Sequence, residues 1–195
     1  MEGAHREQLK LLDRPAYFNV QFENASIDNS SILALGGEAI DMHERCDVLV
    51  TALSSIELVG MMQRVLEMTC QYITNRVQFG QPVAKFQAAR HRAAEMLMKT
   101  ETSRWAAYHA LWRFRQNPSN SDGVSLAKHW AIRAAELIYQ NSHMLHGGIG
   151  VGIEYPLHLY TQPIASFIVR GGNANEMTAR ILNSMNLRMV TRPAT

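Results

Sequence analysis

A glycine-rich segment, Gly147-Gly148-Ile149-Gly150-Val151-Gly152, has the composition of a ligand-binding turn. It does not match the GxGxxG dinucleotide-binding pattern, because Ile153 and Tyr155 stand where the last glycine would be needed. The segment also follows a helical pattern, whereas the Rossmann turn follows a strand. The sequence therefore excludes a Rossmann site. Two alternatives remain: a helix C-cap followed by a turn, or backbone amides that approach a phosphate closely.

Arg76 stands at the last turn of a long helical pattern, directly before a segment that ends in Phe79-Gly80-Gln81-Pro82. A cation at this place interacts favourably with the carbonyls at the C-terminus of the helix. The planar fork of an arginine also suits a diphosphate. The residue alone leaves both roles open.

Three histidines, His143, His146 and His158, lie close to the glycine-rich segment. A zinc site would need cysteine or carboxylate partners at ligand spacing. A di-iron bundle would need two Glu-x-x-His motifs on separate helices. The sequence shows neither pattern, so we expect no metal site.

Long helices must position these residues. Apolar side chains recur at spacings of three and four over residues 46–75, 86–115 and 124–145, as on helices that bury one face. Two shorter helices are expected near residues 156–167 and 175–185. Long helices joined by short loops predict an all-α fold, an antiparallel helical bundle that forms one domain over residues 41–195. The eleven methionines could fill the core of this bundle or an interface between bundles.

Residues 1–40 have a different character. The segment 16–22 is rich in aromatic and β-branched residues and predicts a strand, and the residues after it have the composition of a loop. The strand has no recognisable partner in the sequence, and a single strand is not stable. We therefore interpret residues 1–40 as a short remnant of a β-domain and a linker.

Composition excludes several classes of protein. The net charge is only +2 and the basic residues are scattered, which argues against a nucleic-acid partner. No uninterrupted apolar run reaches the length of a membrane span, and the charged N-terminal residues do not resemble a secretion signal. Cys46 and Cys70 have no pairing framework, so we expect a reduced, cytoplasmic protein.

Three motifs, in this order along the chain, resemble the acyl-CoA dehydrogenase family. Tyr17-Phe18-Asn19-Val20-Gln21-Phe22-Glu23-Asn24-Ala25 is similar to the last strand of the family's middle β-domain. Arg76-x-x-Phe79-Gly80-x-Pro82, with Phe86-Gln87 after it, resembles the signature between two long helices of the C-terminal domain. His146-Gly147-Gly148-Ile149-Gly150 and Glu154-Tyr155-Pro156-Leu157-His158-Leu159-Tyr160 resemble a later segment of that domain. The resemblance covers nearly the whole chain.

The resemblance implies a flavoprotein that oxidises acyl-CoA thioesters to the 2,3-enoyl form with FAD, while a carboxylate removes the α-proton. Family members also have an N-terminal helical domain and a full middle β-domain, so a partial chain is expected. FAD lies at a subunit interface of a dimer or tetramer. The implied partners are an acyl-CoA, further copies or a sister dehydrogenase subunit, and an electron-transfer flavoprotein. The residues that would contact FAD are Arg76, Gln78, Phe79, Gly147, Gly148 and Asn173.

The chain departs from the family pattern at three places. Met144 stands where members usually have a glutamine that bonds to the cofactor. The usual position of the catalytic glutamate falls on Gly171, and the position used by a smaller branch falls on Val50. Neither side chain can take a proton. The remaining candidates for the base are the nearby carboxylates Asp47, Glu57 and Glu176.

Three hypotheses follow. The chain could belong to an acyl-CoA dehydrogenase whose base is an unexpected carboxylate such as Asp47. It could instead be a catalytically silent, structural or cofactor-sharing subunit that completes the FAD site of a partner carrying the base. It could also be a helical interaction domain without a flavin role. We expect the first, and keep the second as its main alternative.

Overall fold

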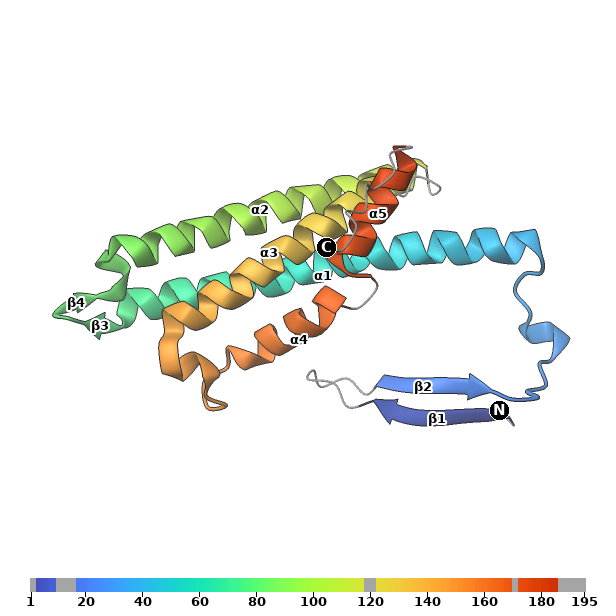
Figure 1. Ribbon diagram of the computed structural model, residues 1–195, viewed down its shortest axis with the longest axis horizontal. Helices are drawn as coiled ribbons and strands as arrows, with labels where there is room; N and C mark the ends of the chain where they lie inside the picture. Colours follow the sequence, from blue (N-terminus) through green and yellow to red (C-terminus); the bar gives the residue numbers. More distant parts are fainter. Residues whose placement is uncertain (1–2, 10–16, 118–121, 170–171, 186–195) are drawn as a thin grey trace, which may run out of the picture.

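A bundle of long helices forms the body of the molecule in the computed structural model, which describes residues 3–9, 17–117, 122–169 and 172–185 (Figure 1). The three long helices are α1 (Gly37–Asn75), α2 (Gln87–Gln116) and α3 (Asp122–His146), and each packs against the other two. Helix α4 (His158–Val169) packs on α1 and α3, and α5 (Ala174–Ser184) packs on α3. The predicted all-α bundle is confirmed.

The main core lies between α1, α2, α3 and α4. Burial of these apolar faces stabilises helices that would be marginal alone. Ala107 on α2, and Ala131 and Ala135 on α3, are fully buried, and such small side chains let helix axes approach closely. The larger buried side chains of this core include Leu58, Met62, Val65, Met96, Ile138, Leu157, Ile164 and Phe167.

One charged side chain lies inside this bundle. Lys128 on α3 is fully buried, and its Nζ donates to Ser54 Oγ at 3.2 Å and to the carbonyl oxygen of Phe167 at 3.3 Å. A buried ammonium needs such partners, because its desolvation is costly. Lys128 therefore ties α3 to α1 and α4, although a lysine in a helical pattern would ordinarily be placed on the solvent face.

Helix α1 is longer than expected. It begins at Gly37, whereas the sequence predicted a start near Cys46, because residues 37–46 carry no regular apolar stripe. Half of those residues are good helix formers, namely Glu38, Ala39, Met42, Glu44 and Arg45. The first part of α1 is mostly exposed and extends beyond the other helices in Figure 1.

By length and composition, α1 could cross a membrane. That observation is weak evidence, because the core helix of a soluble protein has the same properties. Here α1 contributes Leu58, Met62 and Val65 to the core, so the bundle accounts for much of its apolar character.

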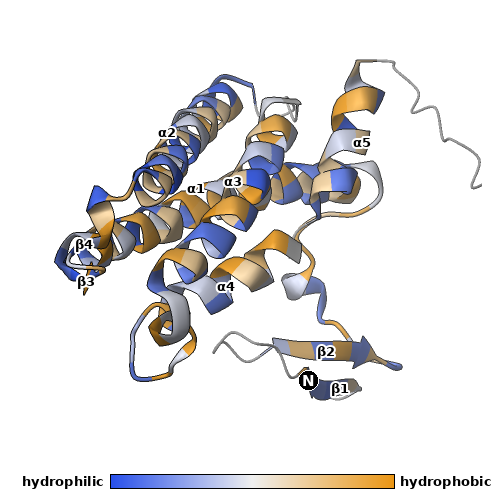
Figure 2. Cartoon of the chain, turned by 60° about the vertical axis from the view of Figure 1, so that its left-hand side comes forward, coloured by the Kyte–Doolittle hydropathy of each residue, from blue (hydrophilic) through white to orange (hydrophobic). Residues whose placement is uncertain are grey.

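The structure contains one strand that the sequence did not predict, and this strand pairs with the predicted one. β1 (Ala4–Leu9) and β2 (Tyr17–Phe22) form an antiparallel pair, with Ala4 opposite Phe22 and Leu9 opposite Tyr17. The expectation of a strand without a partner was wrong, because β1 is polar and carries none of the residues that favour strands. Among the described residues this sheet has two strands, and it stands apart from the bundle in Figures 1 and 2.

Candidate functional site

The site predicted from the sequence begins with a tight turn at the end of α1. β3 (Val77–Gln78) and β4 (Gln81–Pro82) pair antiparallel, and Phe79 and Gly80 connect them with φ values of 52° and 78°. Positive φ at both central residues is the geometry of a type I′ hairpin turn. A positive φ strains a bulky residue such as Phe79, whose side chain is also 92% exposed. Strain of this kind concentrates at functional sites.

Arg76 forms the base of this hairpin. Its amide donates to the carbonyl oxygen of Tyr72 at 2.8 Å, and its own carbonyl oxygen accepts from the amide of Val83 at 2.8 Å. Within the described part of the chain, the exposed Arg76 guanidinium makes no ion pair or side-chain hydrogen bond. Gln78 is exposed as well, and its Nε2 donates to the carbonyl oxygen of Val77 at 2.8 Å. The cation at this turn is therefore available to a ligand.

The glycine-rich segment follows α3 as a short 3-10 helix, η3 (Gly147–Val151). Gly147 has a φ of 63°, the left-handed conformation that commonly ends a helix, so the fold explains this glycine. Gly150 is buried, and a Cβ there would lie 2.8 Å from His146 Cβ, so the fold explains it too. Gly148 is exposed and has no positive φ, and a Cβ added there would meet no other atom within 4 Å. The fold gives no reason for glycine at position 148.

His146 connects η3 to the end of α1. Its Nδ1 lies 2.8 Å from the carbonyl oxygen of Ser142, which can only accept, so Nδ1 carries the proton. Its Nε2 then accepts from the hydroxyl of Tyr155 at 3.2 Å. The ring also stacks on Tyr72, with the centroids 4.5 Å apart. Burial lowers the pKa of His146 and raises the pKa of Tyr155, which favours this neutral pair.

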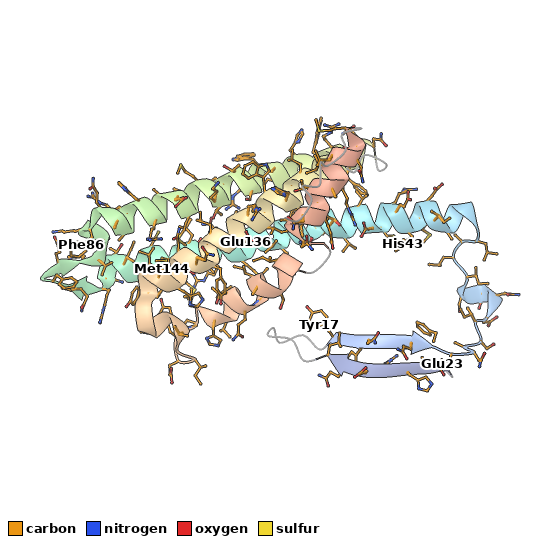
Figure 3. The ribbon with its side chains drawn as sticks, in the orientation of Figure 1. Tyr17, Glu23, His43, Phe86, Glu136 and Met144 are labelled. Carbon is orange, nitrogen blue, oxygen red and sulfur yellow. The ribbon has the colours of Figure 1, made fainter. Side chains whose placement is uncertain are left out.

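These contacts bring the two predicted cofactor-binding segments to one end of the bundle. Tyr72 lies one turn before Arg76, and His146 directly precedes Gly147. Figure 3 shows Phe86, just after the hairpin, and Met144, in the last turn of α3, towards this end. The sequence reasoning missed Tyr72 and Tyr155 as supports of the site, because no local spacing relates them to the glycines.

His143 links the end of α3 to α4. Its Nε2 lies 3.2 Å from Thr161 Oγ1 on α4, and burial lowers its pKa. Across the described residues, no group of three or more His, Cys, Asp and Glu side chains is arranged to hold a metal ion.

Asn173 does not join this site. It is the N-cap of α5, where its side chain accepts from the amides of Asn175 and Glu176 and the Glu176 carboxylate accepts from the Asn173 amide. The first residue of α5, Ala174, lies beside His129, near the start of α3. Gly147 follows His129 by eighteen positions along α3, a helical rise of about 27 Å. Within one chain, Asn173 is thus far from the glycine-rich segment.

The candidate bases lie in different surroundings. Asp47 accepts an ion pair from Arg180 on α5 at 2.9 Å, and Glu176 is held in the capping box. Glu57 and Val50 are exposed on α1, and Gly171 lies outside the described residues. Met144 is exposed next to the glycine-rich segment.

Comparison with known proteins gives a consistent result. The chain is 30% identical over 120 residues to the acyl-CoA dehydrogenase FadE28 of Mycobacterium tuberculosis, covering 62% of this chain and 35% of that protein. The structure of a glutaryl-coenzyme A dehydrogenase with glutaryl-CoA matches 100% of this chain with a TM-score of 0.89 and 22% identity. One subunit of the ChsE4–ChsE5 complex of Mycobacterium tuberculosis matches 97% of it with a TM-score of 0.87 and 23% identity.

The chain spans about a third of the length of the curated relatives that it matches and about half of each solved structure. The family model described as acyl-CoA dehydrogenase, C-terminal domain, matches residues 50–185 of the sequence, which contain the β3–β4 hairpin and η3. The chain therefore belongs to the acyl-CoA dehydrogenase family, whose C-terminal helical domain it contains.

Proposed function

We propose that this chain is the C-terminal part of an acyl-CoA dehydrogenase-like flavoprotein and contacts FAD through Arg76, Gln78, Phe79, Gly147 and Gly148. The observation that carries this proposal is Gly148, for which the fold gives no reason and which lies at the same end of the bundle as the turn that carries Arg76. Glycine suits a place where another molecule's atoms must approach the backbone. When bound, FAD supplies the oxidant that accepts the β-hydride of an acyl-CoA.

The roles of the residues follow from their chemistry. The Arg76 guanidinium is suited to charge-assisted hydrogen bonds with a diphosphate. The small glycine turn leaves room for a phosphate against the backbone. The exposed ring of Phe79 offers a flat apolar surface that can cover part of the cofactor and exclude water. The Met144 side chain cannot donate the hydrogen bond that a glutamine at this position would give to the cofactor. Binding of FAD by this chain would therefore depend on Arg76, the glycine turn and Phe79.

A cofactor-sharing subunit is the second candidate, and the ion pair between Asp47 and Arg180 favours it. In this ion pair a carboxylate oxygen of Asp47 contacts the Arg180 guanidinium, whereas a general base needs its oxygen within reach of the substrate proton. Val50 cannot act as a base. In this alternative the chain completes the FAD site of a partner, and the partner carries the carboxylate that removes the α-proton.

The N-terminal segment also supports a role within a larger assembly. Ile27, Leu33, Leu35 and Met42 line an apolar hollow of about 560 Å³ beside the start of α1, and Phe18, Val20 and Phe22 are exposed on β2. Exposed apolar residues gathered in this way are typical of an interaction site. We propose self-association or a sister dehydrogenase subunit as the partner, an electron-transfer flavoprotein as the electron acceptor, and the cytoplasm as the location.

Titration of FAD fluorescence with the chain tests the flavin site. Gly148→Ala should leave the thermal midpoint unchanged and weaken FAD binding, because the new methyl group occupies space that the proposal gives to the cofactor. Gly150→Ala should lower the free energy of unfolding by about 1–3 kcal/mol through its overlap with His146. Gly123→Ala, far along α3, is the matched control. Equal FAD affinities for Gly148→Ala and Gly123→Ala would contradict the proposal.

Reduction of the flavin by an acyl-CoA separates the two candidates. If Asp47 is the base, the flavin of the wild-type assembly should bleach with an acyl-CoA, and Asp47→Asn should slow bleaching by about 100-fold or more. If a partner supplies the base, Asp47→Asn should leave the rate unchanged. Arg180→Gln, which breaks the same ion pair but leaves the carboxylate, controls for a merely structural effect.

A further inference from the structure

Two histidine rings lie next to the glycine-rich segment, one helical turn apart near the end of α3. His146 is 3% exposed, and His143 is half-buried. Burial lowers the pKa of both rings, so both are neutral near pH 7. The residues proposed to contact the FAD diphosphate, Gly147 and Gly148, follow His146 directly along the chain. The two rings are therefore the titratable groups nearest in sequence to that part of the proposed site.

The hydrogen bonds of His146 suit its protonated form as well as its neutral form. Nδ1 donates to the carbonyl oxygen of Ser142 at 2.8 Å in either form. Nε2 lies 3.2 Å from the hydroxyl oxygen of Tyr155, which can donate to a neutral ring and accept from a charged one. An added proton would therefore leave both hydrogen bonds in place. Removal from water is the main reason why this ring stays neutral.

His143 is held in a similar way. Its Nε2 lies 3.2 Å from Thr161 Oγ1, and the backbone of Gly150 forms a hydrogen bond with the ring that favours the charged form. The two rings are close enough for a charge on His143 to disfavour a charge on His146. The pair is therefore expected to take up one proton, and not two.

The pair has no counter-charge of its own. In the described part of the chain, no carboxylate forms an ion pair with either ring. The titratable or charged side chains around them are Tyr72 and Arg64 on α1, Tyr139 on α3, Glu154 and Tyr155 before α4, and His158 on α4. The only carboxylate of this set, Glu154, is exposed. A diphosphate bound at the glycine-rich segment would supply the negative charge that these surroundings do not.

We propose that His143 and His146 together take up one proton when the diphosphate of FAD binds at Gly147 and Gly148. The pair then adds a second cation to the site that carries Arg76. The reason is electrostatic, because a nearby dianion stabilises a buried imidazolium and the imidazolium in turn stabilises the bound dianion. This inference rests on the proposed FAD site, and it assigns two further residues to that site.

Linkage gives the sign of the pH dependence. The free chain binds this proton only below the lowered pKa of the pair, whereas the complex binds it at higher pH. Between the two values, binding of FAD takes up a proton, so the affinity for FAD rises as pH falls. For one proton the rise is at most about tenfold per pH unit. The phosphodiester groups of FAD are fully ionised in this range and take up no proton themselves.

Isothermal titration calorimetry of FAD in two buffers of different ionisation enthalpy measures the number of protons taken up. At about pH 6, wild type should take up a proton fraction of up to about one. The double variant His143→Gln/His146→Gln should take up none, whereas His91→Gln, an exposed histidine on α2, should behave as wild type. Binding of FAD by wild type without proton uptake, or equal uptake in the three proteins, overturns the inference and leaves the proposed FAD site in place.

The affinities of the same proteins at two pH values separate charge from structure. Near pH 8 both rings are neutral, so the double variant should bind FAD as tightly as wild type. At about pH 6 it should bind several-fold more weakly, within the limit of tenfold per pH unit. An equal loss of affinity at both pH values would show that the rings act only through the fold, and would overturn the inference.

Proton NMR of the histidine rings tests wild type without any substitution. The titration midpoint of His143 or His146 should move to higher pH when the 195-residue chain is saturated with FAD. Riboflavin, which has the isoalloxazine ring but no phosphate, should leave both midpoints unchanged. An unmoved midpoint with FAD, or an equal shift with riboflavin, overturns the inference. If Gly148→Ala binds FAD as tightly as wild type, the proposed FAD site itself is wrong, so the two failures are distinguishable.

Discussion

The ring of Tyr72 stacks on the ring of His146, with their centroids 4.5 Å apart and their planes at 23°. This contact joins the last turn of α1 to the last residue of α3. Arg76 is one turn beyond Tyr72, and Gly147 is the next residue after His146. The relative position of Arg76 and the glycine-rich turn therefore depends on a contact between two aromatic rings.

Protonation of His146 is expected to destabilise the fold. Burial lowers the pKa of His146 and His143 below the usual 6.5, so between the lowered values and about 6.5 the unfolded chain binds more protons than the folded chain. The free energy of unfolding should rise with pH through this window and fall on acidification. Each histidine contributes at most about 1.4 kcal/mol per pH unit. Urea unfolding at several values between about pH 5 and pH 7 measures the slope.

Two glutamine variants isolate this contribution. His146→Gln removes the titrating ring and should make the dependence of stability on pH shallower than in wild type. His91→Gln changes an exposed histidine on α2 and should leave the slope as it is. An identical slope in wild type and His146→Gln would show that the buried ring does not set the pH dependence.

Replacement of Phe79 by asparagine should change stability and ligand binding in opposite directions. Asparagine tolerates a positive φ better than phenylalanine, so Phe79→Asn should raise the free energy of unfolding by about 1 kcal/mol. The same change removes the exposed ring and should weaken FAD binding. Thermal melts and FAD titration of one preparation measure both effects.

Val77→Asn is the matched control for that variant, since Val77 is exposed in the same hairpin and has no positive φ. It should not stabilise the chain, and it should not change the FAD affinity. A Phe79→Asn protein that gains stability but keeps its full FAD affinity would assign Phe79 a purely structural role.

Asn173 is expected to stabilise the fold of this chain. Asn173→Ala removes the N-cap of α5 and should lower the free energy of unfolding by about 1 kcal/mol. Hydrogen exchange in α5 should become faster while exchange in α1 stays the same. Asn175→Ala, two residues later and also exposed, keeps the cap and should have a much smaller effect. Equal losses in the two variants would contradict the capping role.

The sequence predicted the elements whose residues repeat with a helical period. The apolar positions of α1, α2 and α3 recur at three and four because each helix buries one face, so the bundle could be derived directly. β1 was missed because Ala4–Leu9 is polar, and its pairing with β2 depends on a contact between distant residues. The early start of α1 at Gly37 was also missed, because the first residues of α1 are helical but bury no apolar stripe that a sequence pattern could show.

The site was predictable as a set of residue types but not as an arrangement. Arg76 and Gly147 could be singled out because cations and glycines have few roles at helix ends. Their placement at one end of the bundle requires the contact between Tyr72 and His146, and no local pattern encodes it. The positive φ of Phe79 is equally invisible in the sequence, as is the burial of Lys128, whose partners come from two other helices.

The β1–β2 hairpin has a consequence for the solubility of the chain. In the described residues it is a two-stranded sheet, with Phe18, Val20 and Phe22 exposed along one face of β2. Strand edges without a partner are templates for further strand pairing, and exposed apolar residues favour aggregation. When the purified chain is concentrated, association through this hairpin should precede unfolding of the bundle. A charge placed in β2, such as Val20→Lys, should keep the helical domain in solution without altering the helices themselves.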